Sequence, residues 1–333
     1  QNAGKRSLTL NLKHPQGRGI FFRLIEKADV LVENFRPGVM ERLGLGFDKL
    51  KEINPQLVYC AISGFGQDGP LWDSPAYDQI IQGLSGSMSV TGTDDSGPLR
   101  VGFPMSDTIG GITAALGITA SLSQPKREAV FIDVSMLEST MATMGWIISN
   151  YLSAGIDPQR MGNENFTSAP SGAFQTGSGL LNIAANKQEQ YEILCGLLER
   201  KDLVNHPDFI SRELRKQHRE KLKQELEKEL QQNSAAYWSK QLNQAGVPAG
   251  EVLSVPQALE MQQIRERGFL EKFEEVPGLE KPVQLVRTGI QLNGKPLSVQ
   301  RPPPQLGEDT HAILKDCGYN DDEIANFHQE KVI

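Results

Sequence analysis

Short apolar runs alternate with segments of helical periodicity up to residue 135. Apolar and polar residues alternate over 7–12, which predicts a strand, and a turn is predicted at 14–17. Three continuous apolar runs predict buried strands: residues 28–33, 55–63 and 129–135. Apolar residues recur at helical spacing in the intervening segments: residues 19–27, 39–45, 47–53 and 76–84. This order predicts βαβ units and a parallel sheet, and therefore an α/β fold.

Residues 136–153 are apolar on nearly every side, which predicts one long helix buried within the protein. Residues 154–169 are polar and contain glycine, as is typical of a linker. Composition changes beyond this linker and again near residue 262. We therefore predict three segments: residues 1–160, 170–262 and 263–333.

The segment 170–262 has the pattern of a small α+β domain. Apolar stretches at 172–175 and 180–184 flank a Thr-Gly-Ser-Gly turn and predict a hairpin. Amphipathic spacing predicts four helices, which are residues 187–200, 211–232, 235–245 and 255–267. The second of these interleaves charges of both signs, which favours a solvated helical face over a nucleic-acid patch.

The composition narrows the class of protein. The 333 residues are enough for a large core and two domains, and 38% hydrophobic with 23% charged residues is typical of a globular chain. A net charge of -7 argues against nucleic acid or an anionic membrane as the main partner. The sequence also contains no apolar run of transmembrane length.

The cysteines and histidines indicate the cellular compartment and whether a metal site is expected. The 3 cysteines are far apart and odd in number, which indicates a reducing compartment such as the cytoplasm. The 5 histidines are scattered, so we predict no metal site. The sequence has no initiator Met and no signal-peptide apolar region, and we expect it to begin inside a domain. A targeting peptide would then not be visible, which keeps the mitochondrial matrix as an alternative location.

A turn at Pro104 opens a predicted helix with an acidic residue, Asp107, at its start. The residues on either side of Asp107 are serine and threonine, types that also cap helix N-termini. Small residues follow, including Gly110 and Gly111, so that another backbone can approach closely. The carboxylate has two interpretations. It is either an N-cap favoured by the helix dipole, or a nucleophile with oxyanion-stabilising N–H groups near Gly110 and Gly111.

Eight short, distinct motifs follow one another along nearly the whole chain. They are Gly4-Lys5-Arg6-Ser7, Leu10-Asn11-Leu12-Lys13, Asp29 to Gly38, Ser63-Gly64-Phe65-Gly66, Ala76-Tyr77-Asp78, Asp107 with its glycines, Asp133-Val134-Ser135-Met136, and Arg301-Pro302-Pro303 with Leu306-Gly307. Each is weak alone, but their order and spacing together are specific. In this respect the sequence resembles the class III CoA-transferases of the CaiB/BaiF type, which include formyl-CoA transferase, and their relative α-methylacyl-CoA racemase.

The resemblance implies a fold and an assembly. It implies a Rossmann-like, parallel-sheet large domain that binds CoA, joined to a small α+β domain. The large domain takes in both ends of the chain, so residues 263–333 are expected to return to it. The resemblance also implies an interlocked homodimer.

The resemblance further implies which residues form the site. One group matches a segment lining the CoA site: Leu10, Asn11, Leu12 and Lys13. A second group matches residues near the adenine and phosphates: Asn34, Phe35, Arg36 and Arg42. Tyr77 and Met136 match further CoA contacts. Asp107 matches the nucleophilic aspartate, and Asp78 matches an acidic neighbour of it.

These residues also have structural alternatives. Arg36 and Arg42 suit phosphate charge but also suit surface ion pairs. Met136 suits the core, and Tyr77 suits a structural packing role. Asp78 suits a helix cap.

The activity implied by the resemblance moves CoA from an acyl-CoA donor to a carboxylic acid. Asp107 attacks the donor thioester to give a mixed anhydride, and the CoA thiolate then converts this anhydride to an aspartyl-CoA thioester. The acceptor carboxylate attacks next, and CoA is returned to it. Each step exchanges one activated carboxylate for another, so we expect no metal, no redox cofactor and no tightly bound cofactor. The CoA thioester is a substrate.

The racemase is the alternative activity. It needs two groups that remove and return an α-proton. The racemases of the family have a histidine directly before the acid that matches Asp78. Tyr77 stands there in this sequence and is a poor base near neutral pH, which favours transfer.

The sequence departs from the family pattern in three places. The family's opening strand–helix unit, which supplies part of the CoA site, has no counterpart before Gln1, and a Thr-Gly-x-Gly turn has none before the 129–135 strand. Residues 167–172 replace the run of glycines of formyl-CoA transferases, which argues against formyl and oxalate specificity. Residues 161–165 and 184–188 look more like transferases for succinyl-CoA and small dicarboxylic acids.

Overall fold

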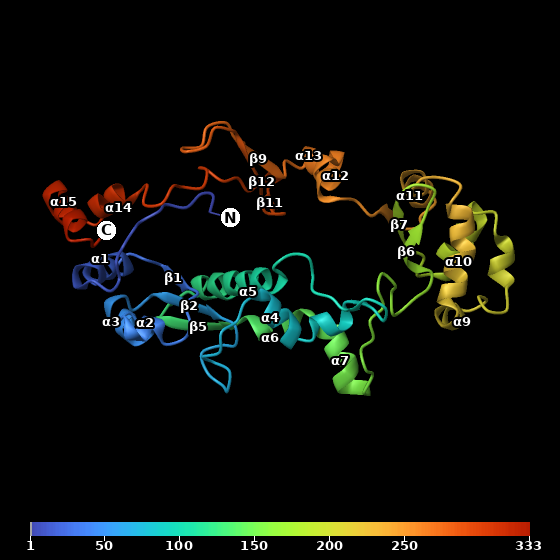
Figure 1. Ribbon diagram of the computed structural model, residues 1–333, viewed down its shortest axis with the longest axis horizontal. Helices are drawn as coiled ribbons and strands as arrows, with labels where there is room; N and C mark the ends of the chain where they lie inside the picture. The colour runs from blue at the N-terminus through green and yellow to red at the C-terminus, as the bar shows by residue number, and fades with distance from the viewer. Residues whose placement is uncertain (1) are drawn as a thin grey trace. The chain divides into compact units, whose positions relative to one another are not determined.

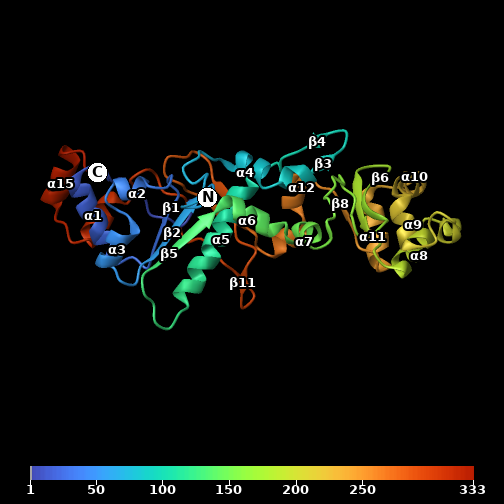
Figure 2. The ribbon, with the colours of Figure 1, turned by 90° about the horizontal axis from the view of Figure 1, so that it is seen from below.

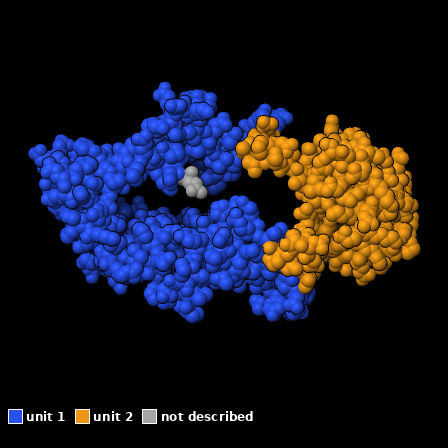
Figure 3. Space-filling model, in the orientation of Figure 1, with its two compact units in different colours: residues 1–89, 99–158, 262–333 blue, residues 90–98, 159–261 orange. Residues whose placement is uncertain are grey.

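The structure, a computed structural model, describes residues 2–333 and contains two compact units (Figure 3). Unit 1 comprises residues 1–89, 99–158 and 262–333, and unit 2 comprises residues 90–98 and 159–261. Unit 1 is therefore built from three separate stretches of sequence. Unit 2 is one long stretch joined by the short hairpin of β3 (Gly92–Thr93) and β4 (Gly97–Pro98).

A three-stranded parallel sheet forms the centre of unit 1. Its strands are β1 (Val30–Glu33), β2 (Val58–Ser63) and β5 (Val130–Ser135), in the order β1-β2-β5 (Figure 2). The predicted parallel sheet is confirmed, with Cys60 of β2 opposite Val32 on one side and Ile132 on the other. Parallel strands need cover on both faces, which is why these runs are apolar throughout.

Alternate residues of β2 point to opposite faces of the sheet. Tyr59 and Ala61 pack with the helices α1 (Pro15–Ile25), α2 (Val39–Arg42) and α3 (Phe47–Ile53). Cys60 packs on the opposite face against Ala114 of α5 (Met105–Leu122). Helices therefore cover both faces of the sheet. The first turn of α5 lies at the carboxyl ends of the strands.

The C-terminal helices pack against α1 in unit 1. The helices α14 (Thr310–Asp316) and α15 (Asp321–Gln329) bury Leu314 and Phe327 in one cluster with Ile20 of α1 (Figure 1). The predicted strand at 7–12 is wrong. That segment is extended, but its N–H groups donate to side chains and to the C-terminal backbone, as from Ser7 to Asp309 Oδ2 at 2.8 Å.

Three helix predictions also need correction. The predicted turn at 14–17 is wrong, because α1 already begins at Pro15. Proline has no backbone N–H, but the first N–H groups of a helix have no partner within the helix, so proline is well tolerated at this position. The long helix predicted at 136–153 breaks at Met144 into α6 (Met136–Thr143) and α7 (Gly145–Ala154). None of the residues of α7 is buried within the described chain. The helix predicted at 255–267 is divided at Met261 into α12 (Val255–Glu260) and α13 (Gln262–Glu266).

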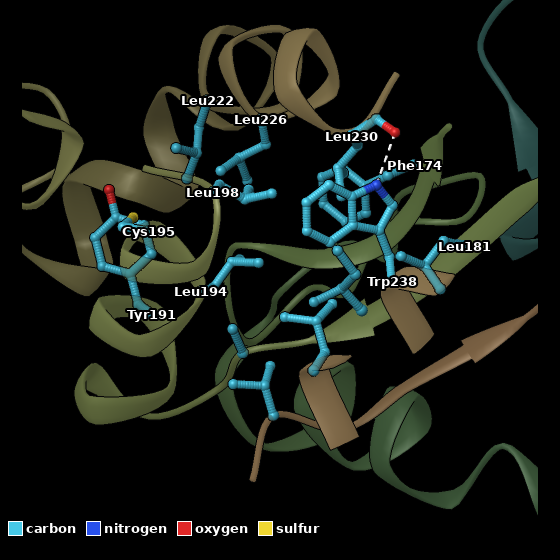
Figure 4. Packing of buried hydrophobic residues seen from close by; sticks show 14 of the residues in the cluster. Phe174, Leu181, Tyr191, Leu194, Cys195, Leu198, Leu222, Leu226, Leu230 and Trp238 are labelled. Carbon is cyan, nitrogen blue, oxygen red and sulfur yellow. Dashed lines mark hydrogen bonds between the residues drawn. The ribbon is translucent and has the colours of Figure 1, made fainter. Parts of the chain in front are cut away.

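Unit 2 folds an antiparallel sheet under a layer of helices. The predicted hairpin is confirmed as β6 (Ser171–Gln175) and β7 (Leu180–Ala184), and β8 (Ala249–Glu251) pairs with β7. Its core joins Phe174 and Leu181 to Leu194 and Trp238 (Figure 4). The Trp238 indole N–H donates to Leu230 O at 2.9 Å.

The predicted charged helix of unit 2 is two helices, α9 (Arg212–Gln217) and α10 (Arg219–Leu230). Leu222, Leu226 and Leu230 recur every four residues on α10 and are buried, which leaves the charged positions toward solvent. The remaining elements are α4 (Asp78–Leu84), η1 (Ser87–Val90), α8 (Gln188–Leu197), η2 (Lys201–Asn205), α11 (Ala235–Gln244), α12 (Val255–Glu260), α13 (Gln262–Glu266), β9 (Leu270–Phe273), β10 (Val283–Val286), β11 (Gln291–Leu292) and β12 (Lys295–Pro296).

Residues 2–333 contain neither a membrane-spanning helix nor a cluster of metal-binding side chains. No helix there combines the length and the apolar character that crossing a bilayer requires. No three His, Cys, Asp or Glu side chains in the same range gather in a way that would hold a metal ion.

Candidate active site

An open cavity of about 410 Å³ lies in unit 1 beyond the carboxyl ends of the parallel strands. In open α/β sheets this edge is where ligands bind. Its wall combines the ends of β1 and β2, the loop before α4, the first turns of α5 and the start of α6. Six predicted site residues line it: Asn34, Phe35, Arg36, Tyr77, Asp107 and Met136.

Local contacts fix this wall. The Asn34 side chain follows β1 and donates from Nδ2 to Ile62 O of β2 at 2.6 Å, which ties the two strand ends together. Gly64 follows β2, and a Cβ there would lie 2.4 Å from the Cβ of Ala76. Only glycine allows this approach, so the loop leading to Tyr77 lies directly against the end of β2.

Asp107 lies in the first turn of α5, but it does not cap the helix. The helix begins at Met105 after Pro104, which has no side chain able to cap. Asp78, at the start of α4, provides the cap instead: its Oδ1 accepts from the N–H of Ser106 at 2.7 Å and of Asp107 at 3.3 Å. The structure therefore gives the capping role to Asp78 and leaves the Asp107 carboxylate for other chemistry.

The Asp107 carboxylate is exposed to the cavity. Within residues 2–333 no donor or cation bonds to it. Nearby protein atoms and the Asp78 charge raise its pKa, partial burial being the larger cause. A carboxylate without hydrogen-bonding partners, beside a second acid, has both oxygens available for attack on an electrophile.

The expected oxyanion donors near Gly110 and Gly111 are not available. Because α5 starts at Met105, their N–H groups lie inside the helix and are used by its i to i−4 hydrogen bonds. Gly110 instead allows close packing, since a Cβ there would lie 3.2 Å from Met136 Cγ. Met136 is buried at 7% exposure and also lines the cavity, so it belongs to the core, and its contact with CoA stays a prediction.

The two predicted phosphate-binding arginines occupy different surroundings. Arg36 lines the cavity, whereas Arg42 lies outside its lining with its guanidinium near Gly38. Neither forms an ion pair with an acid in the part of the chain that the structure describes, and a role for either arginine in binding phosphate stays a prediction. Tyr77 lines the cavity at 78% exposure, which excludes a packing role within this chain.

The predicted segment Leu10, Asn11, Leu12 and Lys13 lies outside the cavity lining. Leu10 and Leu12 are half-buried against two hydrophobic clusters of unit 1. The Asn11 N–H donates to Val332 O at 2.8 Å. A role for this segment in binding CoA stays a prediction.

Two residues of the site lacked a specific prediction. Trp72 lines the cavity and is 41% exposed, and the signal for it is an aromatic residue in a loop bounded by Pro70 and Pro75. Gln82 is fully buried and donates from Nε2 to Asp78 Oδ2 at 2.6 Å. A glutamine within a helical pattern gives no signal for such a contact.

Comparison with known proteins gives consistent matches. The family model described as CoA-transferase family III matches residues 1–310. The chain is 36% identical over 326 residues to an acetyl-CoA:oxalate CoA-transferase of Acetobacter aceti, covering 95% of this chain and 80% of that protein. It is 33% identical to a succinate–glutarate CoA-transferase of Agrobacterium fabrum, covering 94% of this chain and 78% of that protein.

The fold is also similar to solved structures. The crystal structure of a CaiB/BaiF family protein from Brucella suis superposes with a TM-score of 0.84 at 31% sequence identity. The match covers 95% of this chain and 82% of that chain.

Proposed function

Because this chain belongs to CoA-transferase family III and is a CoA-transferase, we propose that it moves CoA between two acids through covalent intermediates on Asp107. The observation that carries this proposal is the placement of Asp107. Its carboxylate faces a cavity at the carboxyl edge of a parallel sheet, has no bonding partner among the described residues, and is relieved of capping by Asp78.

The proposed reaction needs no external acid or base. An Asp107 oxygen attacks the donor thioester carbonyl, the C–S bond breaks, and CoA leaves as thiolate from an acyl-aspartyl anhydride. The thiolate attacks the aspartyl carbonyl carbon, which releases the donor acid as carboxylate and forms aspartyl-CoA thioester. The acceptor carboxylate then attacks the aspartyl-CoA carbonyl carbon, which expels CoA as thiolate and forms an anhydride between the acceptor and Asp107. The thiolate attacks the acceptor carbonyl carbon of this anhydride and breaks its bond to the Asp107 oxygen. The acceptor leaves as a CoA thioester, and Asp107 is again a free carboxylate.

The substrates follow from the family and the site. Family III transferases use CoA thioesters as substrates. We propose that Arg36, cationic and unpaired beside the cavity, binds a CoA phosphate. The two relatives compared above are named for oxalate and for succinate and glutarate, all dicarboxylic acids. We therefore propose a dicarboxylic acceptor, which a screen of acyl-CoA donors against mono- and dicarboxylic acids tests.

Chemical trapping tests the covalent step. We expect that incubation with an active acyl-CoA donor, followed by hydroxylamine, converts Asp107 to a hydroxamate that peptide mass spectrometry locates. Without the donor, Asp107 should stay unmodified, since a free carboxylate does not react. A racemase acting by proton transfer forms no bond to Asp107. Turnover with no modified peptide would therefore contradict the covalent proposal.

We also propose that the chain forms a homodimer. The apolar side chains Ile112 and Leu116 of α5 are 64% and 71% exposed, and Leu152 of the unburied α7 is 75% exposed. Helices apolar on an outward face are typical of subunit interfaces. We expect sedimentation to give the mass of two chains, and Leu116→Glu to shift the protein toward monomer. A monomeric parent protein at micromolar concentration would contradict this.

A further inference from the structure

Gln82 of α4 bonds to Asp78 of its own helix and to two residues of the segment before α5. Its Nε2 donates to Asp78 Oδ2 at 2.6 Å and to Phe103 O at 3.3 Å. Its Oε1 accepts from the N–H of Val101 at 2.8 Å. The side chain is fully buried, so all of its hydrogen-bonding capacity is used within the protein. It links α4 to the segment that leads into α5.

These partners allow only one orientation of the Gln82 amide. Turning it over would bring Oε1 to the Asp78 carboxylate and Nε2 to the Val101 N–H, and both contacts would be repulsive. The fixed amide holds one oxygen of Asp78 while the other oxygen accepts from the N–H groups of Ser106 and Asp107. A continuous chain of hydrogen bonds therefore runs from Gln82 through Asp78 to the backbone of Asp107.

We propose that Gln82 is a positioning residue for the transfer reaction: its amide holds the charged Asp78 carboxylate against the first turn of α5 and thereby sets the placement of Asp107. It touches neither the cavity nor a substrate, and it acts through Asp78. This inference rests on the proposed function of Asp107. A small displacement of a nucleophile is costly, since about 1 Å can change a rate about 100-fold.

The residues allow an isosteric exchange as a test. In Gln82→Glu alone, a carboxylate oxygen faces Asp78 Oδ2, so the two acids must share a proton. The double variant Asp78→Asn with Gln82→Glu reverses donor and acceptor between the two side chains. The new amide at position 78 then accepts from the α5 backbone and donates to the new carboxylate at position 82, which still accepts from the Val101 N–H. The one contact made worse is that to Phe103 O, which loses its donor and faces a carboxylate oxygen.

We expect Gln82→Glu to lower kcat about 100-fold with a smaller change in donor KM, and the double variant to recover to within about tenfold of the parent. The exchange also moves the negative charge away from the Asp107 backbone. Since the Asp78 charge raises the Asp107 pKa, the acid limb of the kcat/KM profile should move to lower pH in the double variant. This shift follows the charge at position 78 alone, so the role of Gln82 is judged from the fall of kcat at nearly unchanged donor KM in Gln82→Glu and from its recovery in the double variant.

Ser85→Ala is the matched control. Ser85 Oγ donates to the main-chain carbonyl of Gln82 at 3.2 Å and leaves the amide untouched, so we expect nearly parental kcat. Parental kcat in folded Gln82→Glu, a double variant no faster than the single one, or failure of both to fold would each overturn the inference. If Asp107→Asn turned over normally, the proposed function itself would fail. An inactive Asp107→Asn with a fully active Gln82→Glu would remove only this inference.

Discussion

Asp107→Asn should lower kcat for CoA transfer at least about 10⁴-fold, because an amide cannot form the acyl anhydride on which both half-reactions depend. The substitution keeps the size of the side chain. It also keeps the backbone N–H that donates to Asp78, so α5 should start at the same residue. Initial rates with saturating donor and acceptor measure the effect.

Folding should not account for this loss. The Asp107 pKa is raised in the folded protein, so at neutral pH its charge costs stability, and this cost disappears as pH falls through the raised pKa. Removing the charge should therefore leave Tm equal to the parent value or slightly above it. Thr108→Ala, which changes the next residue in the same turn, is the control and should keep most of its activity. Retention of more than about a tenth of parental kcat by Asp107→Asn would contradict the nucleophile assignment.

Arg36→Ala should raise the donor KM about 10- to 100-fold while changing kcat by less than about threefold. A charge-assisted hydrogen bond to phosphate contributes about 1.5–3 kcal/mol, and binding lost equally from ground state and transition state appears in KM. The effect should be absent with small thioesters that lack the nucleotide. Steady-state kinetics with CoA and pantetheine thioesters compare the two cases.

Arg42→Ala is the matched comparison for Arg36. Both arginines follow β1 and lack an ion pair to any described acid, but only Arg36 lines the cavity. We therefore expect a clearly smaller increase in donor KM for Arg42→Ala. An equal or larger increase would place the phosphates away from the cavity and contradict the role given to Arg36.

The layout of the parallel sheet could be predicted because each strand is a short, nearly continuous apolar run. A short apolar run on both sides of the chain fits a strand whose sheet is covered on both faces, and it fits few other structures. The segment at 7–12 has the same local alternation as a strand, yet it bonds to Asp309 and Val332 about 300 residues away. The local sequence does not show whether an extended segment bonds to a neighbouring strand or to distant side chains and backbone. The strand prediction failed for that reason.

The candidate site, like the fold, could be predicted only in part from the sequence. The residue types around Asp107 identified it as either a cap or a nucleophile, but the choice depends on Asp78, which only the fold brings to the helix start. The same holds for Gln82, because the fold brings Val101 and Phe103 to its side chain, which also bonds to Asp78 of the same helix. Apolar pattern also misled at α7, because periodicity cannot tell a helix buried within one chain from one left on its surface.

The packing of α14 and α15 against α1 has a consequence for the order of events during synthesis. The central strands and α1 leave the ribosome early, but the cluster that buries Ile20 is completed only when α14 and α15 have emerged. Most of unit 2 lies between them as the single stretch 159–261 and has its own core, so it has all of its main parts sooner. The sheet and the helices on both of its faces are made before that stretch, and only the side of α1 that carries Ile20 lacks its partners until the last helices are made.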